Sequence, residues 1–167
     1  MVHNPSNLPE GPTGDELVRL LAEDIREVFS TMVDMEALLH LPMQIDAMTQ
    51  FENCVTAMVG LAGTYNGVVS LHAPLRQALA MTTGMLGVQV TEFNEDVCDA
   101  VGEIANMVAG SFKQHLSRGG SDIRLSTPSV ITGTEYTVAA QNPEDTITLH
   151  FATNEDWFVA SATFEKE

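Results

Sequence analysis

Two polar residues, Glu103 and Asn106, lie three positions apart in a stretch that is otherwise apolar and small. The stretch runs from Asp99 to Gly110 and reads Asp-Ala-Val-Gly-Glu-Ile-Ala-Asn-Met-Val-Ala-Gly. Residues at this spacing share one face of a helix. A carboxylate and a carboxamide side by side on the wet face of a core-packed helix can carry chemistry, so this pair is the main candidate site in the chain.

The segment that follows Asn94 predicts the helix that positions this pair. Asn94 is a candidate N-cap, and Gly119 and Gly120 are expected to end the helix after roughly 23 residues. Basic residues are expected in its last turn, where the macrodipole favours them: Lys113, His115 and Arg118. One apolar stripe is expected to face a sheet: Val97, Val101, Ile104, Ala105, Val108 and Phe112. The opposite face would carry Asp99, Glu103, Asn106, Gly110 and Lys113.

The residues at and around Asn106 lower the stability of this helix. Asn is a poor helix-interior residue, because its side chain competes for backbone hydrogen bonds. Gly102 and Gly110 each cost about 1 kcal/mol relative to Ala. Small residues on an exposed face would let another surface approach, so Asp99, Gly102, Gly110 and Lys113 are candidate docking residues. The Glu-x-x-Asn spacing alone has little specificity, and a solvated surface pair is the alternative.

The bulk composition narrows the class of protein. A chain of 167 residues with 44% hydrophobic residues predicts one domain with a real core. The 23 acidic and 7 basic residues give a formal charge of −16, which argues against nucleic acid and membrane partners. Residues 1–12 are expected to be a flexible segment rather than a signal peptide, ahead of a single domain at 13–167. Cys54 and Cys98 are expected to be reduced core thiols of a cytoplasmic protein, with a disulfide between them left open.

The rest of the sequence predicts an α+β fold, with a largely antiparallel sheet and long helices packed on one face. Two further helices are expected at about 15–35 and 75–85, the second ended by Gly84 or Gly87. Strands are expected at 54–61, 65–72, 122–126, 129–131, 136–141, 146–153 and 157–164. Hairpin turns at 63–67 and 154–156 would join two pairs of these strands. Trp157 and Phe158 are expected to anchor the last strand, in the core or at a dimer edge.

Other kinds of site find little support. The five histidines lack metal-site spacing, and no Cys-x-x-Cys is present, so no metal or cofactor is expected to be bound by the chain. No glycine-rich phosphate loop occurs. Ser111 and Ser117 lack the Gly-x-Ser-x-Gly context of a hydrolase nucleophile.

Two of the predicted helices share a weak internal sequence similarity, called the echo below. Glu27-Val-Phe-Ser30-Thr-Met has the shape of Glu103-Ile-Ala-Asn106-Met-Val. A degenerate duplication would explain the match, and so would chance.

The motif helix resembles the signature helix of the CheC/CheX/FliY phosphatases of bacterial chemotaxis, and most closely that of CheX. Their active-site motif is Glu-x-x-Asn followed by a small residue. Three further segments resemble the family in order and spacing: Val28–Met32, Gly67–His72 and Pro128–Gly133. CheC has two such helices. This chain has one, because Ser30 stands where the echo would need Asn, and no activity is assigned to the first helix.

The resemblance implies a phosphatase that hydrolyses the aspartyl phosphate of a CheY-like response regulator, in chemotaxis or a related two-component system. Asn106 would orient the attacking water, since a carboxamide both donates and accepts hydrogen bonds. Glu103 would pair with the regulator's active-site Lys. Mg²⁺ would be held by the regulator. The family also implies a homodimer that shares β-structure.

Two alternatives belong to other classes. A non-catalytic binding module on the same fold would dock a response regulator or a flagellar switch protein without hydrolysis. An inert structural dimer is the third reading. The intact Glu103 and Asn106 favour the phosphatase over the binding module, and Asn106 with its two neighbouring glycines counts against the inert dimer.

Overall fold

The computed structural model describes residues 14–40, 48–139 and 145–166. Its helical elements are α1 (Gly14–Val28), the π-helical turn η1 (Phe29–Val33), α2 (Leu75–Leu86), α3 (Glu95–Lys113) and the 3₁₀ turn η2 (Arg118–Gly120). Its strands are β1 (Leu38–His40), β2 (Met48–Gly63), β3 (Tyr65–Pro74), β4 (Ile123–Leu125), β5 (Ser129–Ala139), β6 (Thr146–Ala152) and β7 (Trp157–Lys166).

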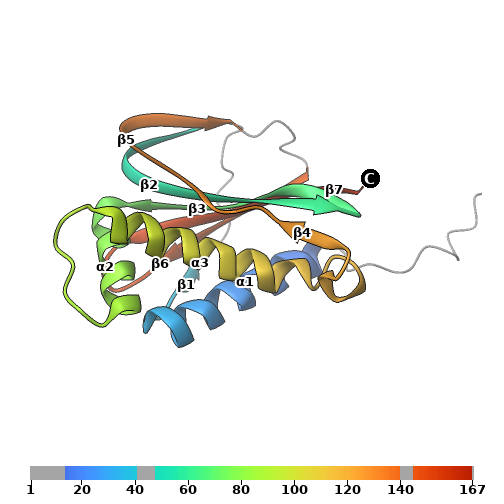
Figure 1. Ribbon diagram of the computed structural model, residues 1–167, viewed down its shortest axis with the longest axis horizontal. Coiled ribbons are helices and arrows are strands. Elements are labelled where there is room, and N and C mark those ends of the chain that lie inside the picture. Colours follow the sequence, from blue (N-terminus) through green and yellow to red (C-terminus); the bar gives the residue numbers. More distant parts are fainter. Residues whose placement is uncertain (1–13, 41–47, 140–144, 167) are drawn as a thin grey trace, which may run out of the picture.

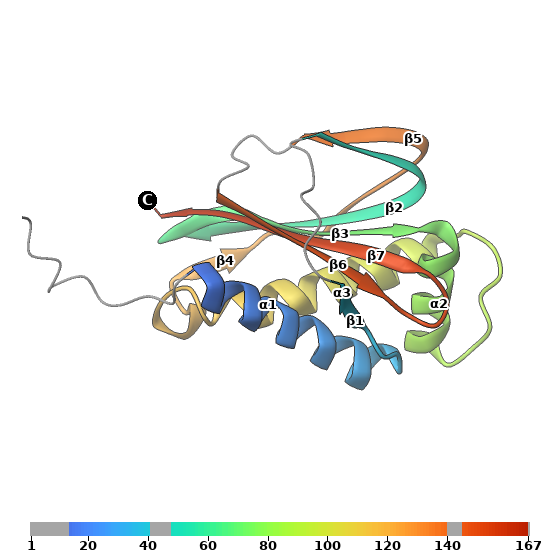
Figure 2. The ribbon, with the colours of Figure 1, turned by 180° about the vertical axis from the view of Figure 1, so that it is seen from behind.

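The strands form one sheet in the order β1-β6-β7-β3-β2-β4, and β5 also pairs with β2. Every described pairing is antiparallel. The three long helices lie on the same face of this sheet (Figures 1 and 2). The α+β architecture expected from the sequence is therefore confirmed, and α3 lies along the middle of the helical layer.

The core lies between the helices and the sheet. The apolar residues of β2 and β3 that pack in this core are spaced two apart along each strand: Val55, Ala57, Val59, Leu61, Val69, Leu71 and Ala73. Residues between them are buried as well, on the other face of the sheet: Cys54, Thr56, Ser70 and His72. The six residues of the predicted α3 stripe are all fully buried, at 0% exposed. The 3.6-residue periodicity thus oriented α3 correctly.

The α3 helix is shorter than its sequence predicts. It ends at Lys113, and the backbone N–H groups of His115 and Leu116 bond to carbonyls three residues back instead of four. The ammonium group of Lys113 donates to the carbonyls of Gly120 and Ile123, at 3.1 and 2.9 Å. The chain therefore turns back toward β4 before reaching the two glycines, which both have positive φ.

Two strand predictions also change. The predicted strands 129–131 and 136–141 are one continuous strand, β5, because Gly133 keeps its place opposite Cys54 in the ladder; residues 140 and 141 lie outside the described part. The predicted strand 54–61 is part of the longer β2, whose ladder with β5 is interrupted at Asn53, which has φ 48°. Beyond this point the outer parts of β2 and β5 rise from the sheet as a two-stranded arm (Figure 1).

The helix ends and the thiols are otherwise close to expectation. The first helix changes to a π turn after Val28 and is closed by Asp34 in the left-handed conformation. Gly87, with φ 71°, ends α2. Both cysteines are free, Cys54 buried and Cys98 half-buried, so Cys98 is less enclosed than a core thiol.

The strand order of the sheet is symmetric about its centre. Reading the order from the opposite end, and exchanging β1 with β4, β2 with β6 and β3 with β7, gives the same order. Each half then consists of a helix followed by strands, and the first strand of each half pairs with the other half. Shifting α1 and the η1 turn that continues it by 76 positions places four of their buried residues on four buried residues of α3: Leu21 on Val97, Ile25 on Val101, Val28 on Ile104 and Phe29 on Ala105. This arrangement favours the internal duplication over a chance match.

A buried histidine makes the fold sensitive to acid. His72 is 4% exposed, and its Nδ1 lies 2.9 Å from the hydroxyl of Thr56. Desolvation by burial lowers the pKa of His72 to about 4, whereas an unfolded histidine has a pKa of about 6.5. The unfolded chain therefore binds this proton first as the pH falls. The contribution of neutral His72 to the free energy of unfolding is complete above about pH 6.5 and is lost as the pH falls toward 4.

We expect the free energy of unfolding to fall by about 2 kcal/mol more between pH 7 and pH 5 in the wild type than in His72→Asn. Urea unfolding at the two pH values measures this difference. An equal fall in both proteins would show that His72 does not titrate in this way.

Candidate functional site

The α3 helix presents Glu103 and Asn106 on a firmly held segment. The side chain of Asn94 accepts a hydrogen bond from the N–H of Val97 at 3.3 Å, as predicted for the N-cap. Between the two polar residues, Ile104 and Ala105 are fully buried against the core. The carboxylate and the carboxamide therefore project from a helix whose opposite side cannot shift without disturbing the core.

The two polar side chains are differently exposed. Glu103 is exposed, and Asn106 is half-buried. Within residues 14–40, 48–139 and 145–166, no hydrogen bond or ion pair engages the side chain of either residue. A half-buried carboxamide to which none of the described residues bonds can interact with a partner without first breaking contacts with that part of the chain.

One docking residue was placed wrongly from the sequence. Gly102 is buried, and a Cβ at this position would lie 3.3 Å from Cβ of Pro128 and 3.5 Å from Val130. The missing side chain makes room for the chain's own segment between β4 and β5, so Gly102 does not offer space to a partner. Gly110 is half-buried, and a Cβ there would meet Leu125 at 3.9 Å.

The two glycines also locate the neighbour of Asn106. They lie four residues before and after it, in the same row of the helix, and they face Pro128 and Leu125. The segment 125–128 therefore runs beside Asn106, and Ser126 and Thr127 are exposed there. This segment was not expected beside the site. The sequence signal was the pair of glycines spaced symmetrically about Asn106.

The charged candidates have different surroundings. Lys113 donates to two carbonyls at the end of α3, so its first role is to hold the turn toward β4, and it is not a free docking group. Asp99 is exposed one turn before Glu103. Its docking role, and that of Gly110, stay predictions.

The cysteine near the site is not activated. Burial, with smaller contributions from the carboxylates of Asp99 and Glu95, raises the pKa of the Cys98 thiol, so a thiolate nucleophile is disfavoured beside the site.

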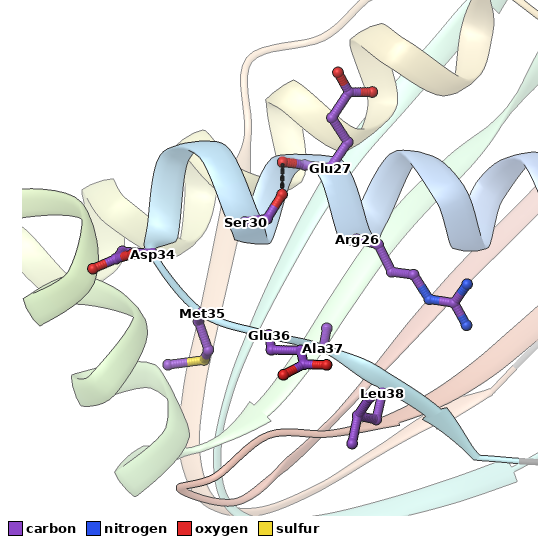
Figure 3. A pocket seen from close by; sticks show the side chains of 8 residues that line it. All are labelled: Arg26, Glu27, Ser30, Asp34, Met35, Glu36, Ala37 and Leu38. Carbon is purple, nitrogen blue, oxygen red and sulfur yellow. Dashed lines mark hydrogen bonds between the residues drawn. The ribbon is translucent and has the colours of Figure 1, made fainter.

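The echo of the motif borders an open hollow of ≈ 620 Å³ at the end of α1 (Figure 3). Glu27, Ser30 and the segment 34–38 line the hollow. The hydroxyl of Ser30 donates to the carbonyl of Glu27 at 3.1 Å, so it is bound to its own helix, and the position carries no carboxamide. The structure gives no reason to assign activity to this helix.

The described residues contain no group of three or more His, Cys, Asp or Glu side chains that could hold a metal ion. None of the helices among them is long and apolar enough to cross a membrane.

Fold and site together define an α+β domain in which one turn of a core-packed helix presents a carboxylate and a carboxamide, neither of them bonded within the described ranges. The family model described as chemotaxis phosphatase CheX matches residues 55–152, which include this turn. The chain belongs to the CheX family.

Individual relatives agree with this assignment. The CheY-P phosphatase CheX of Thermotoga maritima is 22% identical over 90 residues, which are 53% of this chain and 58% of that protein, so the match spans little more than half of that relative. The crystal structure of the chemotaxis protein CheX from Desulfovibrio desulfuricans has a TM-score of 0.78 and 29% identity, covering 90% of this chain and 99% of that one. A CheX–CheY–BeF₃–Mg²⁺ complex from Borrelia burgdorferi shares the fold, with a TM-score of 0.63, 15% identity and coverage of 90% and 98%.

Proposed function

We propose that this chain is a phosphatase that removes the phosphoryl group from the phospho-aspartate of a CheY-like response regulator. The observation that carries the proposal is the pair of Glu103 and Asn106 on α3, whose side chains bond to none of the residues that the structure describes. Family membership supports it, as does the name of the Thermotoga relative, a CheY-P phosphatase. The Borrelia complex, which holds CheY, supports a regulator of this type as the partner.

Asn106 orients the water. Its carboxamide can accept a hydrogen bond from a water molecule through Oδ1 and donate to a phosphoryl or carboxylate oxygen through Nδ2. Inserted beside the acyl phosphate, it places the water opposite the leaving carboxylate oxygen. The water oxygen forms a bond to phosphorus, the bond from phosphorus to the aspartate oxygen breaks, and inorganic phosphate leaves. Phosphoryl transfer depends mainly on positioning and electrostatics, so one orienting group has a large effect.

Glu103 docks the regulator. It is the exposed member of the pair, and it reaches the regulator's active-site Lys with a charge-assisted contact. Such a contact contributes about 1.5–3 kcal/mol. The phosphoryl group, the Lys and Mg²⁺ all belong to the regulator, so this chain needs no metal site of its own for the reaction. Local pairing at Glu103 also gives the acidic chain one defined contact with a cationic group.

Replacing Glu103 by Ala is expected to weaken binding of the phosphorylated regulator by roughly 10- to 100-fold, because the charge-assisted contact is lost. Surface plasmon resonance with the immobilised regulator measures the dissociation constant. Glu92→Ala is the matched control, since Glu92 is exposed and precedes the helix. Equal affinities for wild type and Glu103→Ala would remove the docking role.

The proposal as a whole is tested with a panel of purified response regulators, each phosphorylated with a small phosphodonor. Release of inorganic phosphate is followed with and without this chain. Faster release from at least one regulator supports the phosphatase. Binding without faster release would leave the non-catalytic docking module in its place. The homodimer stays a prediction, since the structure describes one chain.

A further inference from the structure

Two histidines lie side by side at one edge of the sheet. His40 of β1 and His150 of β6 are direct cross-strand partners. Their ring centroids are 6.0 Å apart, and their planes are at 88° to each other. His40 is exposed and His150 is half-buried.

The pair lies on the face of the sheet that the helices leave uncovered. The next residue along β6, Phe151, stacks on Phe158 and belongs to the core beneath the helices. Successive side chains of a strand point to opposite faces, so His150 points away from the helices. His40, its cross-strand partner, points the same way.

The spacing of the two rings suits a shared metal ion. A metal–nitrogen bond of about 2.0–2.1 Å puts the centre of an imidazole about 3 Å from the ion. Two ligating rings can therefore have centres as much as about 6 Å apart. Because His40 is exposed, its ring can turn about the side-chain torsions to bring a nitrogen toward the ion.

We propose that His40 and His150 together bind a divalent first-row transition-metal ion, with water in the remaining coordination positions. Imidazole nitrogen is a suitable ligand for Zn²⁺, Ni²⁺ and Cu²⁺. Two protein ligands make an open surface site, unlike the closed four-ligand sites that zinc uses for structure.

Metal binding would hold the edge strand β1 in the sheet. β1 has three residues, and its described pairing is to β6 alone. An ion held by one residue from each strand links the segment after α1 to the rest of the sheet. A ligand that binds only the folded protein stabilises it in proportion to the logarithm of its concentration.

Trp157 provides a local probe of this site. It is the single tryptophan of the chain, and its ring stacks on His150 with centroids 5.5 Å apart and an interplanar angle of 21°. Paramagnetic Ni²⁺ bound to His150 should quench its fluorescence.

The test is a titration of the full chain with NiCl₂, followed by tryptophan fluorescence. Saturable quenching is expected in the wild type and in the control His115→Gln, and it should be lost in His40→Ala and His150→Ala. In a second arm, ZnCl₂ should raise the thermal unfolding midpoint of the wild type but not of His40→Ala, which changes an exposed residue. Absence of saturable quenching up to about 1 mM Ni²⁺, which excludes a dissociation constant well below that concentration, would overturn the site. Unchanged quenching in His40→Ala would overturn it equally.

Discussion

Replacing Asn106 by Ala is expected to lower the rate of regulator dephosphorylation at saturation by about 100-fold or more. Loss of one preorganised transition-state group has an effect of this size in other enzymes. The affinity for the phosphorylated regulator should stay close to that of the wild type, because docking rests on Glu103. The measurement is the saturating rate of phosphate release, together with the dissociation constant.

The same variant separates catalysis from folding. Ala is a better helix former than Asn, and the side chain of Asn106 makes no hydrogen bond within the described part of the chain. Asn106→Ala should therefore unfold at the same urea concentration as the wild type or a higher one. Gln114→Ala, which removes an exposed carboxamide just after α3, is the matched control and should keep full activity. Wild-type phosphate release by Asn106→Ala would end the assignment of this residue.

Replacing Phe158 by Ala is expected to reduce the free energy of unfolding by about 3–5 kcal/mol. Phe158 is fully buried, and its ring is stacked between Phe29 of η1 and Phe151 of β6, with centroids 4.5 and 5.0 Å away. The substitution leaves a cavity where the helical layer meets the sheet, and it removes two aromatic contacts worth about 0.5–1.5 kcal/mol each. Urea unfolding monitored by circular dichroism measures the change.

Phe93 offers a control of the same residue type. It is 43% exposed in the loop before α3, and a surface substitution away from special features changes stability by less than about 0.5 kcal/mol. A loss below about 1 kcal/mol in Phe158→Ala would mean that the three-ring stack does not hold the two layers together. A loss as large in Phe93→Ala would point to a different core.

The local features of α3 could be predicted because they depend on nearby residues. The Asn94 cap, the buried stripe and the exposed position of Glu103 follow from helical periodicity and capping alone. Trp157 and Phe158 show the limit of such reasoning. Adjacent residues of a strand face opposite sides, so Phe158 enters the core while Trp157 stacks on His150 on the other face.

The features that were missed depend on contacts between distant segments. Gly102 was a docking candidate because it is small, yet Pro128 and Val130 cover it from another part of the chain. Helix α3 ends early because the side chain of Lys113 binds carbonyls beyond the turn. A single-helix pattern contains neither of these contacts. The sequence therefore predicted that Glu103 and Asn106 lie on α3, and the structure has them there, while the segment 125–128 beside them was not anticipated.

The most direct test of the proposed phosphatase is the rate of phosphate loss from a phosphorylated CheY-like regulator at increasing concentrations of this chain. The rate should rise and saturate with wild-type protein. With Asn106→Ala it should half-saturate at a similar concentration and reach a plateau about 100-fold lower. Phosphate loss at the regulator's own rate, under conditions where binding is complete, would contradict the account.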